Sequence, residues 1–147
     1  ISFDDVSIRA VPAYTGRHAY HALAYGGLGF LISMKRWDIY YAGDTDLIPE
    51  MDTIGCDIAI LPVGGIYTMG LDEAVEATRR LRPSYVIPMQ YGSEVPNSRE
   101  YGRLFTQAVS EPVQGVERPL ENPRFATRST GTYDIRALRA NLSARGF

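Results

Sequence analysis

The sequence predicts an α/β fold in which a mixed sheet is flanked by helices, and three observations support this. The first part of the chain holds short apolar segments with the alternation typical of strands. The middle part alternates short apolar segments with helical periodicity, which indicates strand–helix–strand units. The length of 147 residues suits one domain of ordinary size, and 45% hydrophobic with 22% charged residues is a normal globular composition.

Strands dominate the first expected elements. Val6, Ile8 and Ala10 alternate with their neighbours up to Pro12. Two apolar segments further on are separated by three residues, which indicates a hairpin. Pro49 lies where the first turn of a helix tolerates proline. In chain order we expect a strand at 6–12, a loop at 13–27, hairpin strands at 28–33 and 37–42, and one or two helical turns within 47–54.

The second half of the chain alternates strands and helices. A short apolar strand is expected at 57–61, followed by Pro62 and a Gly-Gly pair that end it. Ala74, Val75, Thr78 and Leu81 recur at helical spacing, which predicts a helix at 71–81. A strand at 85–89 and a helix that begins at a cap on Asn97 or Ser98 and runs to about residue 109 complete this part.

Residues 111–147 differ in character from residues 1–110. Residues 111–128 are irregular and hold three prolines. Asp134 is a candidate cap for a final amphipathic helix, because Ile135, Leu138 and Leu142 share one face. We therefore divide the chain into a domain at 1–110 and an irregular tail with a terminal amphipathic helix at 111–147.

The composition restricts the partners and the compartment. The formal net charge of −2 gives no nucleic-acid signal. No apolar run approaches the ~20 residues of a membrane span. The one cysteine, Cys56, precedes an apolar strand, so a buried inert thiol is preferred over a nucleophile. We expect a cytoplasmic protein, or one of an organelle matrix after removal of upstream sequence.

Three groups of polar or small residues follow predicted strands directly, and they are the candidate site. They are Asp44, the pair Gly64 and Gly65, and Gln90. Because the carboxyl ends of parallel strands meet at one edge of a sheet, these residues are expected to converge on one cleft. Tyr67 and Tyr91 are expected to be walls of that cleft.

Each of these residues has two interpretations. Asp44 is either a carboxylate that bridges divalent cations or a turn aspartate that accepts hydrogen bonds from backbone amides. Gly64 and Gly65 either let backbone amides approach an anionic substrate or form a tight turn. His18 and His21 are three residues apart in a loop, where they either ligate a metal or lie exposed at a pocket mouth.

Several motifs in order resemble the metallo-β-lactamase-fold hydrolases, within a branch of the ascorbate-6-phosphate lactonase type. The resemblance covers residues 6–105 and is most specific over 40–91. The motifs that carry it are Gly43-Asp44-Thr45, Pro62-Val63-Gly64-Gly65-Ile66-Tyr67-Thr68-Met69, Glu73-Ala74 and Pro88-Met89-Gln90-Tyr91-Gly92. It implies that the fold is the C-terminal half of an αββα sandwich.

The resemblance also implies a chemistry. It is metal-dependent hydrolysis, in which a metal-bound hydroxide attacks an ester, a lactone or a phosphoester. Asp44 would be the catalytic metal ligand, with zinc or manganese as the cation. Gln90 stands where the family has its last histidine ligand, and an amide is a weak neutral ligand. The candidate substrate-binding residues are Gly64, Gly65, Tyr67, His18 and His21.

The family's first metal motif, His-x-His-x-Asp-His, does not occur in the chain. One hypothesis is therefore an enzyme portion completed by upstream sequence; the other is a non-catalytic structural or interaction subunit derived from the same fold. We expect the chain alone to hold no tightly bound zinc or manganese.

The expected partners are the upstream half of the same fold, a second copy or another protein subunit. A half-sandwich leaves apolar strand residues that need a covering layer. Those expected to need it are Val6, Ile8, Leu28, Phe30, Ile58, Ile60, Val86 and Ile87.

Overall fold

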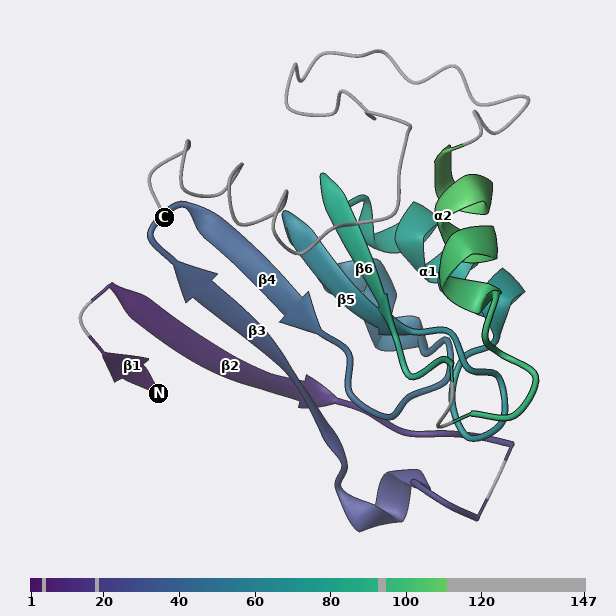
Figure 1. Cartoon of the computed structure of the whole chain (residues 1–147). Coiled ribbons are helices and arrows are strands. Elements are labelled where there is room, and N and C mark those ends of the chain that lie inside the picture. The colour runs from purple at the N-terminus through teal and green to yellow at the C-terminus, as the bar shows by residue number, and fades with distance from the viewer. Residues whose placement is uncertain (4, 18, 93–94, 111–147) are drawn as a thin grey trace.

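The computed structural model describes residues 1–3, 5–17, 19–92 and 95–110. One mixed sheet dominates this part of the chain, with its strands in sequence order from β1 to β6 (Figure 1). The predicted α/β class with a mixed sheet is confirmed. The strands are β1 Ser2–Phe3, β2 Val6–Pro12, β3 Leu28–Met34, β4 Trp37–Tyr41, β5 Ile58–Pro62 and β6 Tyr85–Met89.

The sheet changes character at β4. Strands β1 to β4 pair antiparallel, whereas β4, β5 and β6 pair parallel. The β3–β4 hairpin turns at Lys35, whose φ of 55° is in the left-handed region that such tight turns require. The short strand β1 was not predicted, because two residues are too few to show a period.

The helical elements are η1 Leu23–Tyr25, η2 Pro49–Thr53, α1 Leu71–Leu81 and α2 Tyr101–Ser110. The prediction for α1 is confirmed at both ends. The predicted cap of α2 is wrong, because the Ser98 hydroxyl donates to the Val95 carbonyl and accepts from the Gly92 amide. Ser98 therefore closes the preceding loop, and α2 begins three residues later. The loop at 13–27 also contains the 3₁₀ turn η1, which was not predicted.

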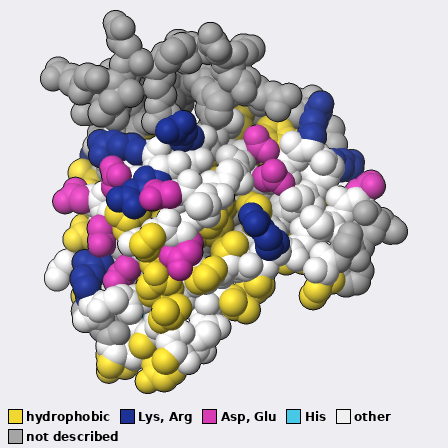
Figure 2. All heavy atoms as spheres, turned by 180° about the vertical axis from the view of Figure 1, so that it is seen from behind, with side chains coloured by type: hydrophobic (Ala, Val, Ile, Leu, Met, Phe, Trp, Pro, Cys, Tyr) yellow, Lys and Arg dark blue, Asp and Glu magenta, His cyan; other side chains and the backbone are white. Residues whose placement is uncertain are grey.

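Helices α1 and α2 pack on one face of the sheet at its β5–β6 end (Figure 1). The row of paired residues on this face is Leu31, Tyr40, Ala59 and Val86. All four are buried, and they belong to one core together with Leu61 and Phe105. Figure 2 shows acidic and basic side chains intermixed on part of this side, with hydrophobic side chains among them, and Arg80 pairs there with Glu76 and Asp52.

The opposite face carries two rows of apolar side chains that cross the sheet from β2 to β6. One row is Ile8, Ile32, Ile39, Ile58 and Tyr85; the other is Ala10, Phe30, Tyr41, Ile60 and Ile87. Most of these residues are half-buried or exposed, although Ile58 is only 3% exposed. We refer to the two rows together as the second face.

The expected list of residues needing a covering layer contains one error. Val86 is 4% exposed and lies on the helix-covered face, opposite in orientation to its neighbour Ile87. Adjacent strand residues point to opposite faces, so the two cannot share a layer.

The proposed tail at 111–147, with its amphipathic helix from Asp134, lies outside the described residues. Within the described ranges, none of the helices is both long and apolar enough to cross a membrane.

Candidate functional site

The ends of the three parallel strands meet at one pocket. Asp44 follows β4, Gly64 follows β5 and Gln90 follows β6, and all three line a pocket of about 340 Å³. The predicted convergence of these residues is therefore observed. Among the residues that the structure describes, those lining the pocket are His21, Asp44, Gly64, Ile66, Tyr67, Thr68, Gln90, Tyr91 and Val95.

A chain of hydrogen bonds fixes the two polar residues at the centre of this pocket. The Thr68 hydroxyl donates to Gln90 Oε1 over 3.3 Å. The Gln90 amide Nε2 in turn donates to Asp44 Oδ1. The backbone of Gln90 has a φ of 58°, in the left-handed region that non-glycine residues rarely adopt. The amide is thus directed at the carboxylate by both its backbone and its neighbour.

The imidazole of His21 lies on the other side of the same carboxylate. His21 Nε2 is 3.4 Å from Asp44 Oδ2, and both side chains are partly exposed, at 40% and 45%. His21 also has a left-handed backbone, with a φ of 60°. The other predicted histidine, His18, lies outside the described residues.

The two glycines have separate roles that favour a structural interpretation. Gly64 is buried, and a Cβ at this position would lie 2.4 Å from the Gln90 carbonyl oxygen. Gly65 has a φ of 79°, and its amide donates to the Met69 carbonyl over 3.1 Å. The Gly65 amide is therefore already used in closing the turn. Gly65 is also not among the residues that line the pocket.

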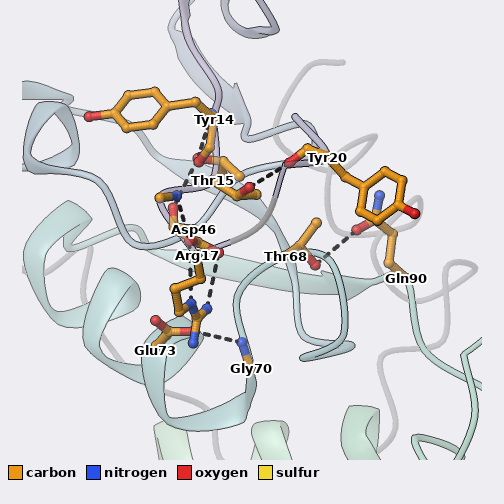
Figure 3. Close-up of polar contacts among 11 residues, drawn as sticks. Tyr14, Thr15, Arg17, Tyr20, Asp46, Thr68, Gly70, Glu73 and Gln90 are labelled. Carbon is orange, nitrogen blue, oxygen red and sulfur yellow. Dashed lines mark hydrogen bonds and ion pairs between the residues drawn. The ribbon is translucent and has the colours of Figure 1, made fainter. Parts of the chain in front are cut away.

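The loop at 13–27 lies on the turn after β4 through hydrogen bonds (Figure 3). The Tyr14 amide donates to the Thr45 hydroxyl over 3.3 Å, and the Asp46 amide donates to the Tyr14 carbonyl over 2.9 Å. Thr15 closes the loop itself: its amide donates to the His21 carbonyl, and its hydroxyl donates to the Tyr20 carbonyl. These contacts hold the loop in a position that places His21 at the pocket.

An ion-pair network strengthens the same attachment. Arg17 pairs with Asp46 over 3.0 Å and with Glu73 over 2.6 Å. The side chain of Asp46 is only 9% exposed, and it also accepts from the Gly16 amide. Glu73 additionally accepts from the Gly70 amide at the start of α1, so the network joins the loop to the helix. These two carboxylates raise the pKa of Arg17 above its usual range, against the effect of burial.

This network was missed in the sequence. Nothing in the spacing of Arg17, Asp46 and Glu73 shows that they meet, because they lie on three separate segments. The sequence signals were that Asp46 directly follows the motif Gly43-Asp44-Thr45 and that Glu73 belongs to the motif Glu73-Ala74.

Replacing Arg17 with methionine is expected to lower the free energy of unfolding by about 1–2 kcal/mol, because the buried Asp46 carboxylate would lose its charged partner while keeping the hydrogen bond from the Gly16 amide. Urea unfolding measures the change. Arg103→Met is the matched control, because Arg103 pairs with Glu100 on an exposed surface and its loss is expected to cost under about 0.5 kcal/mol. Equal effects of the two substitutions would contradict the role given to Arg17.

Aromatic side chains border the pocket. Tyr67, from the loop after β5, and Tyr20, from the loop at 13–27, meet edge to face with ring centroids 5.7 Å apart. Tyr91 packs on α2 so closely that a Cβ on Gly102 would lie 2.4 Å from its ring. Both Tyr67 and Tyr91 line the pocket, as expected of wall residues, and both are exposed to solvent.

Two further titratable residues, Tyr14 and Cys56, lie outside the pocket lining and have raised pKa values. The Tyr14 hydroxyl donates to Glu50 over 3.1 Å, and burial together with this carboxylate raises the pKa of Tyr14. Burial, followed by the charges of Asp57 and Asp38, raises the pKa of Cys56 to about 12. The thiol of Cys56 therefore stays protonated at neutral pH, which fits the inert interpretation.

The donor set of the pocket fits part of a divalent cation's shell. It comprises one carboxylate (Asp44), one imidazole (His21) and one amide (Gln90). Among the residues the structure describes, no group of three or more His, Cys, Asp and Glu side chains lies together in a way that would hold a metal ion. The described residues thus supply too few ligands to hold a cation tightly by themselves.

Comparisons with known proteins agree with the resemblance to metallo-β-lactamase-fold hydrolases. A family model described as a β-lactamase superfamily domain matches residues 1–90. A UPF0173 metal-dependent hydrolase of Thermoplasma acidophilum is 39% identical over 102 residues, covering 63% of this chain and 43% of that protein. One of Staphylothermus marinus is 46% identical over 83 residues, covering 53% of this chain and 36% of that protein.

Solved structures agree with the sequence matches. Igni18, a metallo hydrolase from Ignicoccus hospitalis, is 34% identical with a TM-score of 0.60, over 71% of this chain and 45% of that one. A metal-dependent hydrolase from Parabacteroides distasonis is 30% identical with a TM-score of 0.60, over 74% of this chain and 48% of that one. The chain spans less than half the length of each of these four relatives.

Proposed function

Because the chain belongs to the β-lactamase superfamily, we propose that it forms one half of the active-site cleft of a metal-dependent hydrolase that acts on an ester, a lactone or a phosphoester. The observation that carries this proposal is the pocket in which Asp44, His21 and Gln90 converge at the ends of three parallel strands. Relatives named metal-dependent hydrolases support it. The lactonase-type branch is part of the proposal and rests on the motifs alone.

The residues of the pocket have defined roles in this proposal. A divalent cation, when bound, supplies Lewis-acid chemistry that makes water a better nucleophile and neutralises negative charge. Asp44 holds the cation with its carboxylate. Gln90 orients that carboxylate by its hydrogen bond to Oδ1, and Thr68 orients Gln90 in turn. Zinc and manganese are the proposed cations.

Substrate binding is assigned to the apolar and aromatic lining. Ile66, Tyr67 and Val95 border the polar centre and offer contact to the non-reacting part of a small substrate. Gly64 contributes by its small size, because it lets the ends of β5 and β6 approach each other. The remaining sequence candidates contribute less: the Gly65 amide is used within its own turn, and His18 keeps only its sequence-based assignment.

A non-catalytic role is the alternative, and one observation favours it. Gln90 stands where the resemblance places a histidine ligand, and its amide N–H occupies one oxygen of Asp44. An amide in this place weakens metal binding relative to an imidazole. In this alternative the chain is a structural or interaction subunit that retains the fold and its motif loops.

The two alternatives are separated by supplying the preceding half of the fold. The chain is fused behind the first half of the Staphylothermus marinus relative, and hydrolysis of a p-nitrophenyl ester, bis(p-nitrophenyl) phosphate and a lactone is measured with Zn²⁺, Mn²⁺ or EDTA. We expect metal-dependent hydrolysis of at least one substrate class, and its loss in Asp44→Asn. Activity that appears only after Gln90→His would instead support the non-catalytic alternative.

A further inference from the structure

The two carboxylate oxygens of Asp44 have different neighbours, so each oxygen can have a different role. Oδ1 accepts a hydrogen bond from the Gln90 amide. Oδ2 faces the Nε2 atom of His21 at 3.4 Å, across the pocket. The first contact orients the carboxylate, as hydrogen bonds to ligating carboxylates commonly do. The second pairs an oxygen and an imidazole nitrogen, both of which are good ligands for divalent cations.

The 3.4 Å between His21 Nε2 and Asp44 Oδ2 is longer than an ordinary hydrogen bond, and it matches the distance between two ligand atoms of one metal ion. Zinc binds imidazole nitrogen and carboxylate oxygen at about 2.0–2.2 Å with tetrahedral angles, so two ligands of one ion are about 3.4 Å apart. The two atoms therefore already have the spacing of neighbouring corners of a zinc shell.

The loop holds His21 in this place independently of any contact by its ring. Its carbonyl accepts from the Thr15 amide over 2.9 Å, and its backbone has a φ of 60°, in the left-handed region. Arg17 secures the same loop to the buried Asp46. A strained backbone kept by several fixed contacts is typical of a functional position.

The ring nitrogens of His21 leave both tautomers accessible. Nδ1 is buried and makes no hydrogen bond with the described residues. No partner therefore sets the tautomer from that side. The ring can donate from Nε2 to Asp44, or it can carry its proton on Nδ1 and present the Nε2 lone pair to a cation.

We propose that His21 Nε2 and Asp44 Oδ2 are two ligands of one divalent cation, with zinc as the best fit. His21 thereby supplies, from the loop at 13–27, the imidazole that the strand-end position of Gln90 lacks. Gln90 is a positioning residue that holds Asp44 through Oδ1. The inference rests on the proposed function, since it concerns the same pocket, but it makes a separate claim about which residues bind the ion.

The histidine content of the chain makes the test direct. The chain has two histidines, so an NMR spectrum of the imidazole nitrogens of the 147-residue chain contains two ring systems. Titration with Zn²⁺ at neutral pH, up to about 10 mM, is expected to shift the Nε2 resonance of His21 with saturation. We expect Asp44→Asn to weaken the apparent affinity at least ~10-fold, as loss of a ligand does when so few remain.

Two controls make the result decisive. His18→Gln assigns the spectrum and is expected to leave the zinc response of His21 unchanged. Mn²⁺ at substoichiometric concentration is expected to broaden His21 more than His18. A response confined to His18, an equal response in Asp44→Asn, or no response of His21 up to 10 mM would each overturn the inference.

The outcome is distinguishable from that of the proposed function. A saturable His21 response in the chain, together with no hydrolysis by its fusion, would support the ion site and contradict the proposed hydrolase function. Metal-dependent hydrolysis by the fusion with no His21 response would keep the hydrolase and place its ligands elsewhere.

Discussion

Replacing Gly64 with alanine is expected to lower the free energy of unfolding by about 3–5 kcal/mol, a large part of the 5–15 kcal/mol typical of a domain. The added Cβ would lie 2.4 Å from the Gln90 carbonyl oxygen and 3.3 Å from the nearest methyl of Val95. The closest atom belongs to the backbone, so no side-chain rotation relieves the clash. The ends of β5 and β6 must instead move apart.

Equilibrium unfolding in urea measures this effect. Gly55→Ala is the matched control, because a Cβ on Gly55 has no atom within 4 Å and its backbone is outside the left-handed region. That substitution is expected to change stability by less than about 0.5 kcal/mol. If Gly64→Ala unfolded at the same urea concentration as Gly55→Ala, the close packing of the two strand ends would be refuted.

The same substitution bears on the site. Gln90 is the first residue after β6, and its carbonyl is the atom that Gly64 accommodates. A shift of that backbone would turn the Gln90 amide away from Asp44. The glycine pair, for which the sequence left substrate contact and tight turning equally open, is thus explained mainly by packing in the described structure.

Elements with a clear period were predictable from the sequence. The helix at 71–81 and the strand at 85–89 have the predicted bounds, because apolar spacing, acidic residues at the helix start and Pro83 after its end all agree. The convergence of Asp44, Gly64 and Gln90 was predictable too, since each follows a strand of one parallel set.

Contacts between distant segments were not predictable in the same way. The attachment of Arg17 to Asp46 and Glu73 depends on how a loop lies across a turn and a helix. The orientation of Val86 was mistaken because a short apolar strand shows no alternation, and only the pairing with Ala59 reveals which face it is on. The approach of His21 to Asp44 likewise depends on the course of the loop at 13–27.

The second face of the sheet is an apolar surface that the described helices do not cover. Its rows, which include Ile32, Ile39 and Ile60, cross the sheet from β2 to β6, and these three residues are only half-buried. The half-buried isoleucine and phenylalanine side chains of the two rows number six: Ile8, Phe30, Ile32, Ile39, Ile60 and Ile87. Completing the burial of one such side chain contributes about 1 kcal/mol, so a layer that covers all six contributes about 6 kcal/mol. That is comparable with the stability of an entire domain. We therefore propose that the working protein has this face covered by the upstream half of the fold, with a second copy or another subunit as the other candidates.

Supplying that layer is expected to raise the midpoint of thermal unfolding by more than about 10 °C, since 1 kcal/mol corresponds to about 2–4 °C for a folded unit of roughly 150–250 residues. The comparison is between the 147-residue chain and its fusion to the first half of the Staphylothermus marinus relative, with thermal unfolding measured by circular dichroism.

The chain alone is expected to bind a hydrophobic dye and to associate at micromolar concentration. A double substitution, Ile39→Glu with Ile60→Glu, is expected to weaken both properties, because it places charges in both rows. Thr53→Glu, on the exposed surface of η2, is the control and is expected to leave both unchanged. A monomeric chain that unfolds cooperatively without binding dye would show that the second face needs no covering layer.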